Sequence, residues 1–191
     1  MEKITVKWLT DRNACVSEDE KLIAEKEFKG DIIKILDALI YKNRFLDANW
    51  LFTEYANKKQ CVLYAIFAAE LVLHLFENKY PKDKRPKEAI QAAKDYVKNP
   101  CKKTKAAASA ASAASYASYA SASAAYASSA AYASSASYAS SASYAAYAAS
   151  AAYAASAAHA SFASYASSAA KRELQNKIIK NAISILTRRL K

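Results

Sequence analysis

The chain has 191 residues, a formal net charge of +11 at pH 7 and three cysteines. The length allows one domain with an appendage, and the basic balance permits contact with nucleic acid or an anionic surface. The cysteines are odd in number, widely separated and without partners at metal-ligand spacing, which argues against a disulfide framework and a zinc site. We therefore predict reduced, structural thiols at Cys15, Cys61 and Cys101.

The N-terminal sequence contains no basic segment followed by an apolar run, which a secretory leader would require. The most apolar run, residues 62–76, contains two polar side chains and is shorter than a membrane span. We expect a cytoplasmic protein without a membrane segment.

Capping signals predict the first helices. A short helical or extended segment covers residues 3–12, and Ser17 and Glu20 have the spacing of a capping box. A helix should therefore begin near Glu18 and end at Gly30, the only glycine, which suits the left-handed position after a helix. Asp31 then caps a helix rich in isoleucine and leucine.

Apolar periodicity and prolines predict the next three helices. Residues 45–55 form one, and residues 58–79 form another that is apolar nearly all round, as a central buried helix would be. Pro81 ends that helix. Pro86, in the first-turn position, begins a further helix that closes before Pro100.

Residues 106–170 are a low-complexity run that is almost wholly alanine, serine and tyrosine, with one histidine and one phenylalanine and without Lys, Arg, Asp, Glu, glycine or proline. From Ala127 to Ala169 every third residue is alanine. Alanine favours helix, a period of three does not fit a strand, and a collagen-like helix needs glycine at that position. We favour an α-helix. A 3₁₀-helix is the alternative, because with about three residues per turn each residue class would occupy one face.

The repeat also supplies candidate interaction residues. Its larger side chains keep a six-residue spacing that slips by one triplet between Tyr144 and Tyr147 and includes His159 in place of a tyrosine. The tyrosines can pack on a neighbouring helix with their hydroxyls at the surface. The predicted partner-binding tyrosines are Tyr126, Tyr132, Tyr138, Tyr144, Tyr147, Tyr153 and Tyr165. The alanines expected to allow close helix packing are Ala127, Ala130, Ala133, Ala136, Ala139, Ala142, Ala145 and Ala148.

A basic amphipathic helix is predicted after the repeat. Leu174, Ile178, Ala182 and Ile185 recur at helical spacing between lysines and arginines. The sequence thus indicates an all-α protein in three parts. These are a helical bundle at 1–100, the triplet repeat at 101–170 and the amphipathic helix at 171–191.

Several segments look like parts of one known family. They include Ala48-Asn49-Trp50-Leu51, Phe76-Glu77-Asn78-Lys79-Tyr80-Pro81 and, most specifically, Arg85-Pro86-Lys87-Glu88-Ala89-Ile90. This pattern resembles the putative immunity protein family of bacteria and phages, which has an immunity-protein-five-like domain. Members of that family often continue into an alanine-rich segment with spaced tyrosines and then a charged helix. The resemblance implies a toxin-neutralising or phage–host interaction role, and it carries no catalytic residues.

Glu70 and His74 lie one helical turn apart on the helix predicted to be buried. A carboxylate can orient an imidazole, which would make them an acid–base pair or half of a metal site. Two groups are too few for either role, so we predict a hydrogen-bonded buried polar pair.

Five basic residues are candidates for contact with phosphates or other anions. A solvated basic face is the commoner outcome for such groups. These residues are Arg85, Lys87, Lys102, Lys103 and Lys105.

The sequence favours a non-enzymatic protein that acts by occupying a protein partner, a toxin or a host factor. No metal-ligand spacing, phosphate-binding loop or nucleophile arrangement stands out, so we predict no catalytic activity, metal or cofactor. Two alternatives stay open. One is a nucleic-acid-binding protein that uses its basic termini, and the other is a scaffold that forms homo-oligomers through the repeat.

Overall fold

A computed structural model describes residues 2–108 and 168–188, and over these ranges it consists of helices and turns without strands. The helices are α1 (Val6–Asp11), α2 (Glu18–Lys26), α3 (Ile32–Tyr41), α4 (Phe45–Tyr55), α5 (Lys58–Lys79), α6 (Arg85–Lys98) and α10 (Ser168–Thr187). The all-α class is confirmed for this part of the chain. The predictions for the helix type, tyrosines and alanines of the repeat lie outside the described residues.

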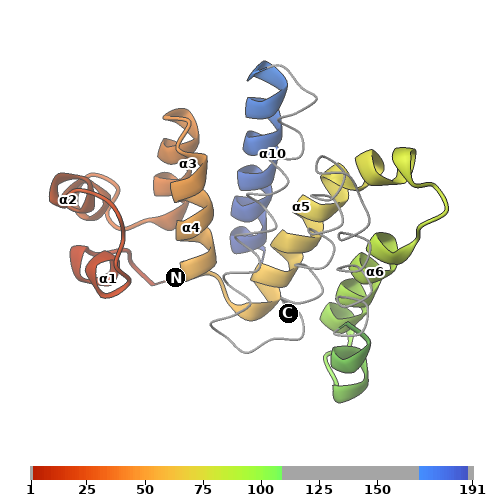
Figure 1. Ribbon diagram of the computed structural model, residues 1–191. Helices are drawn as coiled ribbons and strands as arrows, with labels where there is room; N and C mark the ends of the chain where they lie inside the picture. Colours follow the sequence, from red (N-terminus) through yellow and green to blue (C-terminus); the bar gives the residue numbers. More distant parts are fainter. Residues whose placement is uncertain (1, 109–167, 189–191) are drawn as a thin grey trace.

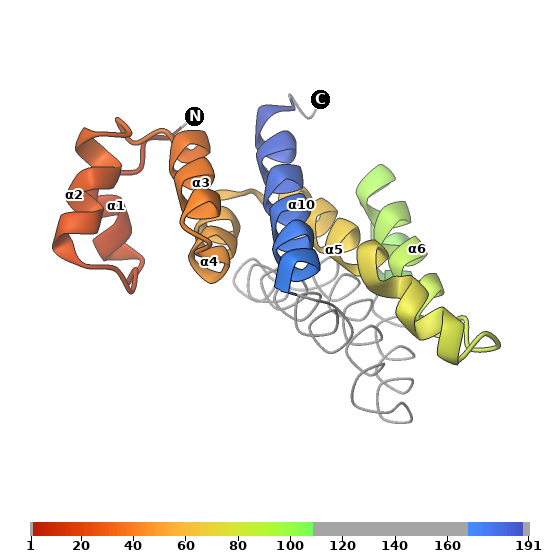
Figure 2. The ribbon, with the colours of Figure 1, turned by 90° about the horizontal axis from the view of Figure 1, so that it is seen from above.

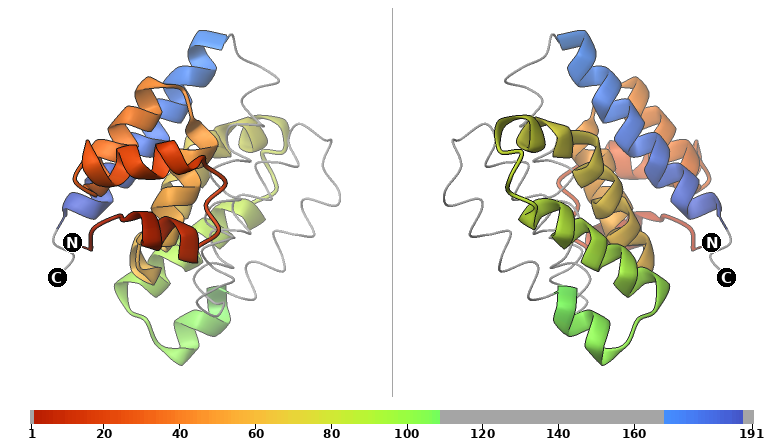
Figure 3. Two further views of the ribbon diagram at one scale, coloured as in Figure 1. Left: turned by 90° about the vertical axis from the view of Figure 1, so that its left-hand side faces the viewer. Right: turned by 90° about the vertical axis from the view of Figure 1, so that its right-hand side faces the viewer.

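The helices lie side by side in a row, and the C-terminal helix α10 lies inside that row (Figures 1 and 2). The α1–α2 pair lies at one end, followed by the α3–α4 pair. Helix α10 packs against α3, α4 and α5, and α6 packs on α5 (Figure 3). The helix that closes the sequence therefore lies in the middle of the fold.

Local capping sets the starts of several helices, and the caps of α2 and α3 are those that the sequence predicts. Ser17 and Glu20 form a complete capping box at the start of α2, in which each side chain bonds the backbone N–H of the other residue. The Asp31 carboxylate accepts a hydrogen bond of 2.9 Å from the backbone N–H of Ile33. A second capping box, formed by Asn57 and Gln60, begins α5. These bonds satisfy backbone donors that the first helical turn leaves free.

Gly30 does not end α2, contrary to the sequence-based expectation, because that helix already ends at Lys26. Its φ of +65° is left-handed, as expected, but its main constraint is a contact distant in sequence. The backbone N–H of Ile4 donates to the Gly30 carbonyl at 2.9 Å. A Cβ atom at Gly30 would lie 2.6 Å from the Ile4 carbonyl oxygen. Glycine is therefore required where the N-terminal segment crosses the chain between α2 and α3.

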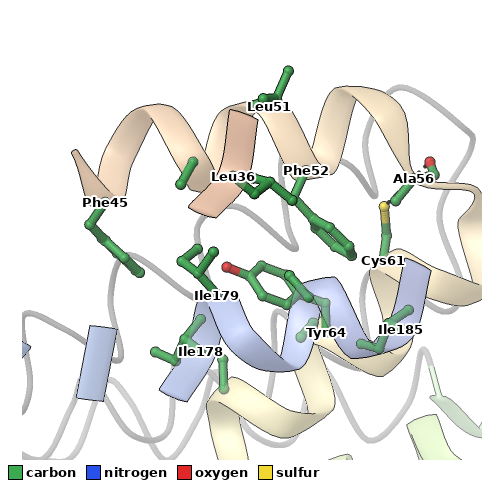
Figure 4. Packing of buried hydrophobic residues seen from close by; sticks show 14 of the residues in the cluster. Leu36, Phe45, Leu51, Phe52, Ala56, Cys61, Tyr64, Ile178, Ile179 and Ile185 are labelled. Atoms are coloured by element: carbon green, nitrogen blue, oxygen red, sulfur yellow. Dashed lines mark hydrogen bonds between the residues drawn. The ribbon is translucent and has the colours of Figure 1, made fainter. Parts of the chain in front are cut away.

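The hydrophobic core includes residues from both described ranges. Ile178 and Ile179 of α10 are fully buried, together with Leu36 of α3, Phe52 of α4 and Tyr64 of α5. Figure 4 shows these side chains packed between the helices. The predicted amphipathic stripe of α10 is confirmed, since Leu174, Ala182 and Ile185 are also buried. Helix α10 consequently belongs to the same core as α3, α4 and α5.

Helix α5 provides the central surface of the core. Its segment Lys58–Asn78, of 21 residues and mean hydropathy 1.5, has the length and composition of a membrane span, so the expectation that it is too short is wrong. Half of that segment is buried inside the protein. An apolar helix with this burial is also what the centre of a helical bundle requires, so the membrane alternative has weak support.

Candidate protein-binding groove

An apolar groove of about 310 Å³ lies between the α1–α2 pair and the α3–α4 pair. Both helix pairs turn through an asparagine with positive φ, Asn13 (52°) and Asn43 (55°), a conformation that asparagine adopts more readily than most residues. The two pairs lie beside each other and leave the groove between them. Its apolar walls include Leu9, Val16, Ile23, Phe28, Leu39 and Trp50.

A charged bridge crosses the groove. The Arg44 guanidinium donates to the Asp47 carboxylate at 2.5 Å and also to the Glu20 carboxylate. Glu20 belongs to α2 and Asp47 to α4, so one arginine connects the two helix pairs. All three residues line the groove.

The electrostatics of this bridge favour its charged form. The pKa of Glu20 lies below its ordinary value, chiefly because the backbone N–H of Ser17 donates to its carboxylate and further because Arg44 bonds it. The pKa of Arg44 is raised, first by its hydrogen bond to Asp47 and then by that to Glu20. The lowered pKa of Glu20 and the raised pKa of Arg44 therefore both favour the ionic pair between these two groups.

Leu46 makes one edge of the groove unusually apolar for a surface. It lines the groove and is 66% exposed, whereas most large apolar side chains of the described residues are at least partly buried. Exposed apolar surface beside a concave site is typical of interaction sites rather than of ordinary solvent-facing helix surface. The groove therefore has the physical character of a binding site for apolar groups.

The three cysteines occupy different environments, and none is in a disulfide, as predicted. Cys15 is exposed and lines the groove, and Cys101 is exposed elsewhere. Cys61 is buried, and burial raises the pKa of its thiol to about 12. Hydrogen bonding to Thr104 lowers the pKa of Cys101. Only Cys61 therefore has the environment of a structural thiol.

The prediction of a buried Glu70–His74 pair is wrong, because both residues are exposed. Glu70, His74 and Asn78 follow one another at four-residue spacing, and this spacing places all three on the solvent-facing side of α5. The Glu70 carboxylate instead bonds the Lys94 ammonium of α6 at 2.5 Å. An exposed ion pair of this kind contributes little to stability.

The predicted anion-binding residues do not form one cluster. Arg85 binds the Asp83 carboxylate through two nitrogens at 2.9 and 2.6 Å, and Lys87 lies 3.7 Å from Glu77. Lys102, Lys103 and Lys105 are exposed and follow the other end of α6. A helix of 14 residues separates the two groups by about 20 Å. They therefore offer two separate basic regions.

No pattern in the amino-acid sequence predicts the groove. Its walls come from separate helices, and the bridge joins residues 24 positions apart. The one available signal is the apolar Leu46 beside Asp47 and Arg44, which breaks the usual pattern of a polar helix start. Among the described residues, no three His, Cys, Asp or Glu side chains are arranged to hold a metal ion.

Over residues 2–108 and 168–188 the structure consists of helices and turns, with an apolar groove between two helix pairs. Residues 52–183 match the family described as "Imm-5 like putative immunity protein", which is more than half of the chain. The chain belongs to this family, as the resemblance indicates. Neither the curated proteins nor the solved structures that we compared with the chain contain a match. The groove is built from residues before position 52, so it lies outside the matched range.

Proposed function

We propose that the protein is a non-enzymatic, immunity-like binding protein that acts by occupying a protein partner, and that the groove is its docking site. Membership of the immunity-like family supports a protein partner. The observation that carries the site is the apolar groove with the exposed Leu46 at its edge. Buried apolar anchors in preformed pockets supply most of the affinity in many protein interfaces.

A capture experiment with matched variants tests this function. The intact protein is immobilised and exposed to nuclease-treated extract of its native cells. Leu46→Gln removes the apolar edge without a change of charge. Tyr41→Gln is the control, because Tyr41 is 88% exposed but does not line the groove. Neither side chain is buried, so both variants should fold.

The expected result is one protein captured in stoichiometric amount by the wild type and by Tyr41→Gln. Capture by Leu46→Gln should be weaker by at least about thirtyfold, the loss that corresponds to removal of a strong interface residue. Equal capture by both variants would refute the groove as the docking site. Recovery of nucleic acid alone in a parallel capture from untreated extract, with no protein captured after nuclease treatment, would refute the protein-binding function.

The two exposed cysteines provide a second readout within the same chain. Cys15 lines the groove, whereas Cys101 lies outside it. A partner in the groove should slow the reaction of Cys15 with a maleimide and leave that of Cys101 unchanged. Unchanged labelling of Cys15 in the captured complex would place the partner elsewhere.

A further inference from the structure

The chain leaves the α1–α2 pair once, through the connection of residues 27–31. Within it, Lys29 and Gly30 both have positive φ, 54° and 65°. Helices α1 and α2 pack mainly on each other, whereas α3 packs on α4 and α10. Figures 1 and 2 show the α1–α2 pair at the end of the row, beside α3 and α4. Residues 27–31 therefore have the position of a hinge, in which a few loop residues absorb a change of backbone angles.

One side of the α1–α2 pair is anchored on the C-terminal end of α4. The Tyr55 hydroxyl donates to the Glu2 carbonyl at 2.8 Å, and the ring centroids of Tyr55 and Trp8 lie 6.2 Å apart. The Arg12 guanidinium covers the Trp8 ring at 4.0 Å and lies 4.0 Å from the Glu54 carboxylate. A hydrogen bond, ring packing and an ion pair therefore hold α1 against the end of α4.

The start of α2 is joined to the start of α4 by the ion pair of Glu20 and Arg44. Their side chains are 38% and 29% exposed, so solvent screens this pair and its energy is modest. Arg44 also donates to Asp47 of its own helix, and Glu20 also accepts from the backbone N–H of Ser17 at 3.0 Å. Separation of the pair therefore leaves each group with a hydrogen-bond partner, which keeps the free-energy cost of separation low.

We infer that the α1–α2 pair is a hinged flap over the groove, and that the Glu20–Arg44 ion pair is the latch that holds this flap closed. The flap stays anchored where α1 meets the end of α4, so release of the latch opens the groove where α2 and α4 begin. The apolar walls favour the closed form, because opening exposes them to water. The inference concerns the groove itself and does not depend on the identity of its occupant.

Distances between two spin labels, measured by double electron–electron resonance, test the latch. Cys15 and Lys42 line the groove from its two sides, so labels at Cys15 and at Lys42→Cys report the opening directly. Cys101→Ser removes the other exposed thiol, and the buried Cys61 stays unlabelled. A reference pair of labels, at Lys42→Cys and Lys180→Cys with Cys15→Ser, lies outside the flap, because α10 packs on α3.

Two variants release the latch, and a third is the matched control. Glu20→Gln removes one charge, and glutamine at this position can keep the capping box of α2. It should raise the ratio of open to closed label distances about two- to fivefold, the factor that corresponds to a partly exposed ion pair. Arg44→Gln should also raise this ratio. Asp47→Asn should leave it unchanged, since it removes a carboxylate from Arg44 without breaking the link across the groove.

A raised ratio in both latch variants, with no rise in Asp47→Asn and a constant reference distance, would support the latched flap. An unchanged ratio in both latch variants, or an equal rise in Asp47→Asn, would show that the ion pair does not hold the groove closed. A change of the reference distance as well would mean that the whole fold loosens, and would overturn a movement confined to α1 and α2. These outcomes are separate from the capture experiment, because a rigid groove can still bind a partner.

Discussion

Replacement of Ile178 by alanine tests whether α10 is part of the core. Ile178 is fully buried, and the substitution removes three carbon atoms from a site packed against other helices. At about 0.8 kcal/mol for each buried carbon, the lost transfer free energy is about 2.4 kcal/mol. The cavity left behind adds to this value, so the free energy of unfolding should fall by about 3–4 kcal/mol.

Urea unfolding followed by circular dichroism at 222 nm measures this loss. The midpoint should decrease while the slope m stays nearly constant, because the mutant still exposes most of the same surface on unfolding. Lys180→Ala is the control, since Lys180 is exposed on the same helix and should change the free energy of unfolding by less than about 0.5 kcal/mol. A loss below about 1 kcal/mol for Ile178→Ala, or equal effects of the two substitutions, would refute the docked position of α10.

Four further predictions concern single groups. Tyr64→Phe should raise the free energy of unfolding by about 1 kcal/mol in urea, because the buried Tyr64 hydroxyl has no hydrogen-bond partner among the described residues; a loss of similar size would contradict this. Gly30→Ala should lower the melting temperature, because a Cβ atom is strained at the positive φ of Gly30 and would contact Ile4. Lys29→Gly should leave the melting temperature unchanged or raise it, because Lys29 has a positive φ of 54° that glycine adopts without strain. The pKa of Glu20 is lower in the folded protein, so its contribution to stability is present above the ordinary value of 4.5 and is lost as pH falls through the folded pKa. The melting temperature of Glu20→Gln should therefore fall less than that of the wild type between pH 7 and pH 3. Iodoacetamide at pH 7.5 should alkylate Cys101 and Cys15 but not the buried Cys61, which peptide mass spectrometry can measure. Thr104→Val should slow the reaction of Cys101 alone, because it removes the hydrogen bond that lowers the pKa of that thiol.

Signals local in sequence predict the helices well, because each depends on neighbouring residues. The capping box of Ser17 and Glu20 begins α2 where expected, and Pro86 lies in the first turn of α6. The predicted ranges 45–55 and 58–79 coincide with α4 and α5. Apolar periodicity likewise predicts which face of α10 is buried.

Features that depend on contacts distant in sequence are not predicted. Gly30 looks like the end of a helix, but its close contact is with Ile4. The buried position predicted for Glu70 assumes that α5 is covered on all sides, whereas one side faces solvent. The groove has no sequence pattern of its own, because it depends on how two helix pairs lie beside each other. Composition alone does not give this arrangement.

The position of α10 in the core has a consequence for synthesis of the protein on the ribosome. Leu36, Phe52 and Tyr64 are made early, but the helix that covers them is encoded at the end of the chain. Ribosomes add about 5–20 residues per second, so residues 109–167 delay the arrival of α10 by about 3–12 s. During that time the nascent N-terminal helices present an uncovered apolar surface. The native core that includes Ile178 and Ile179 can therefore form only after residues 168–187 have been synthesised.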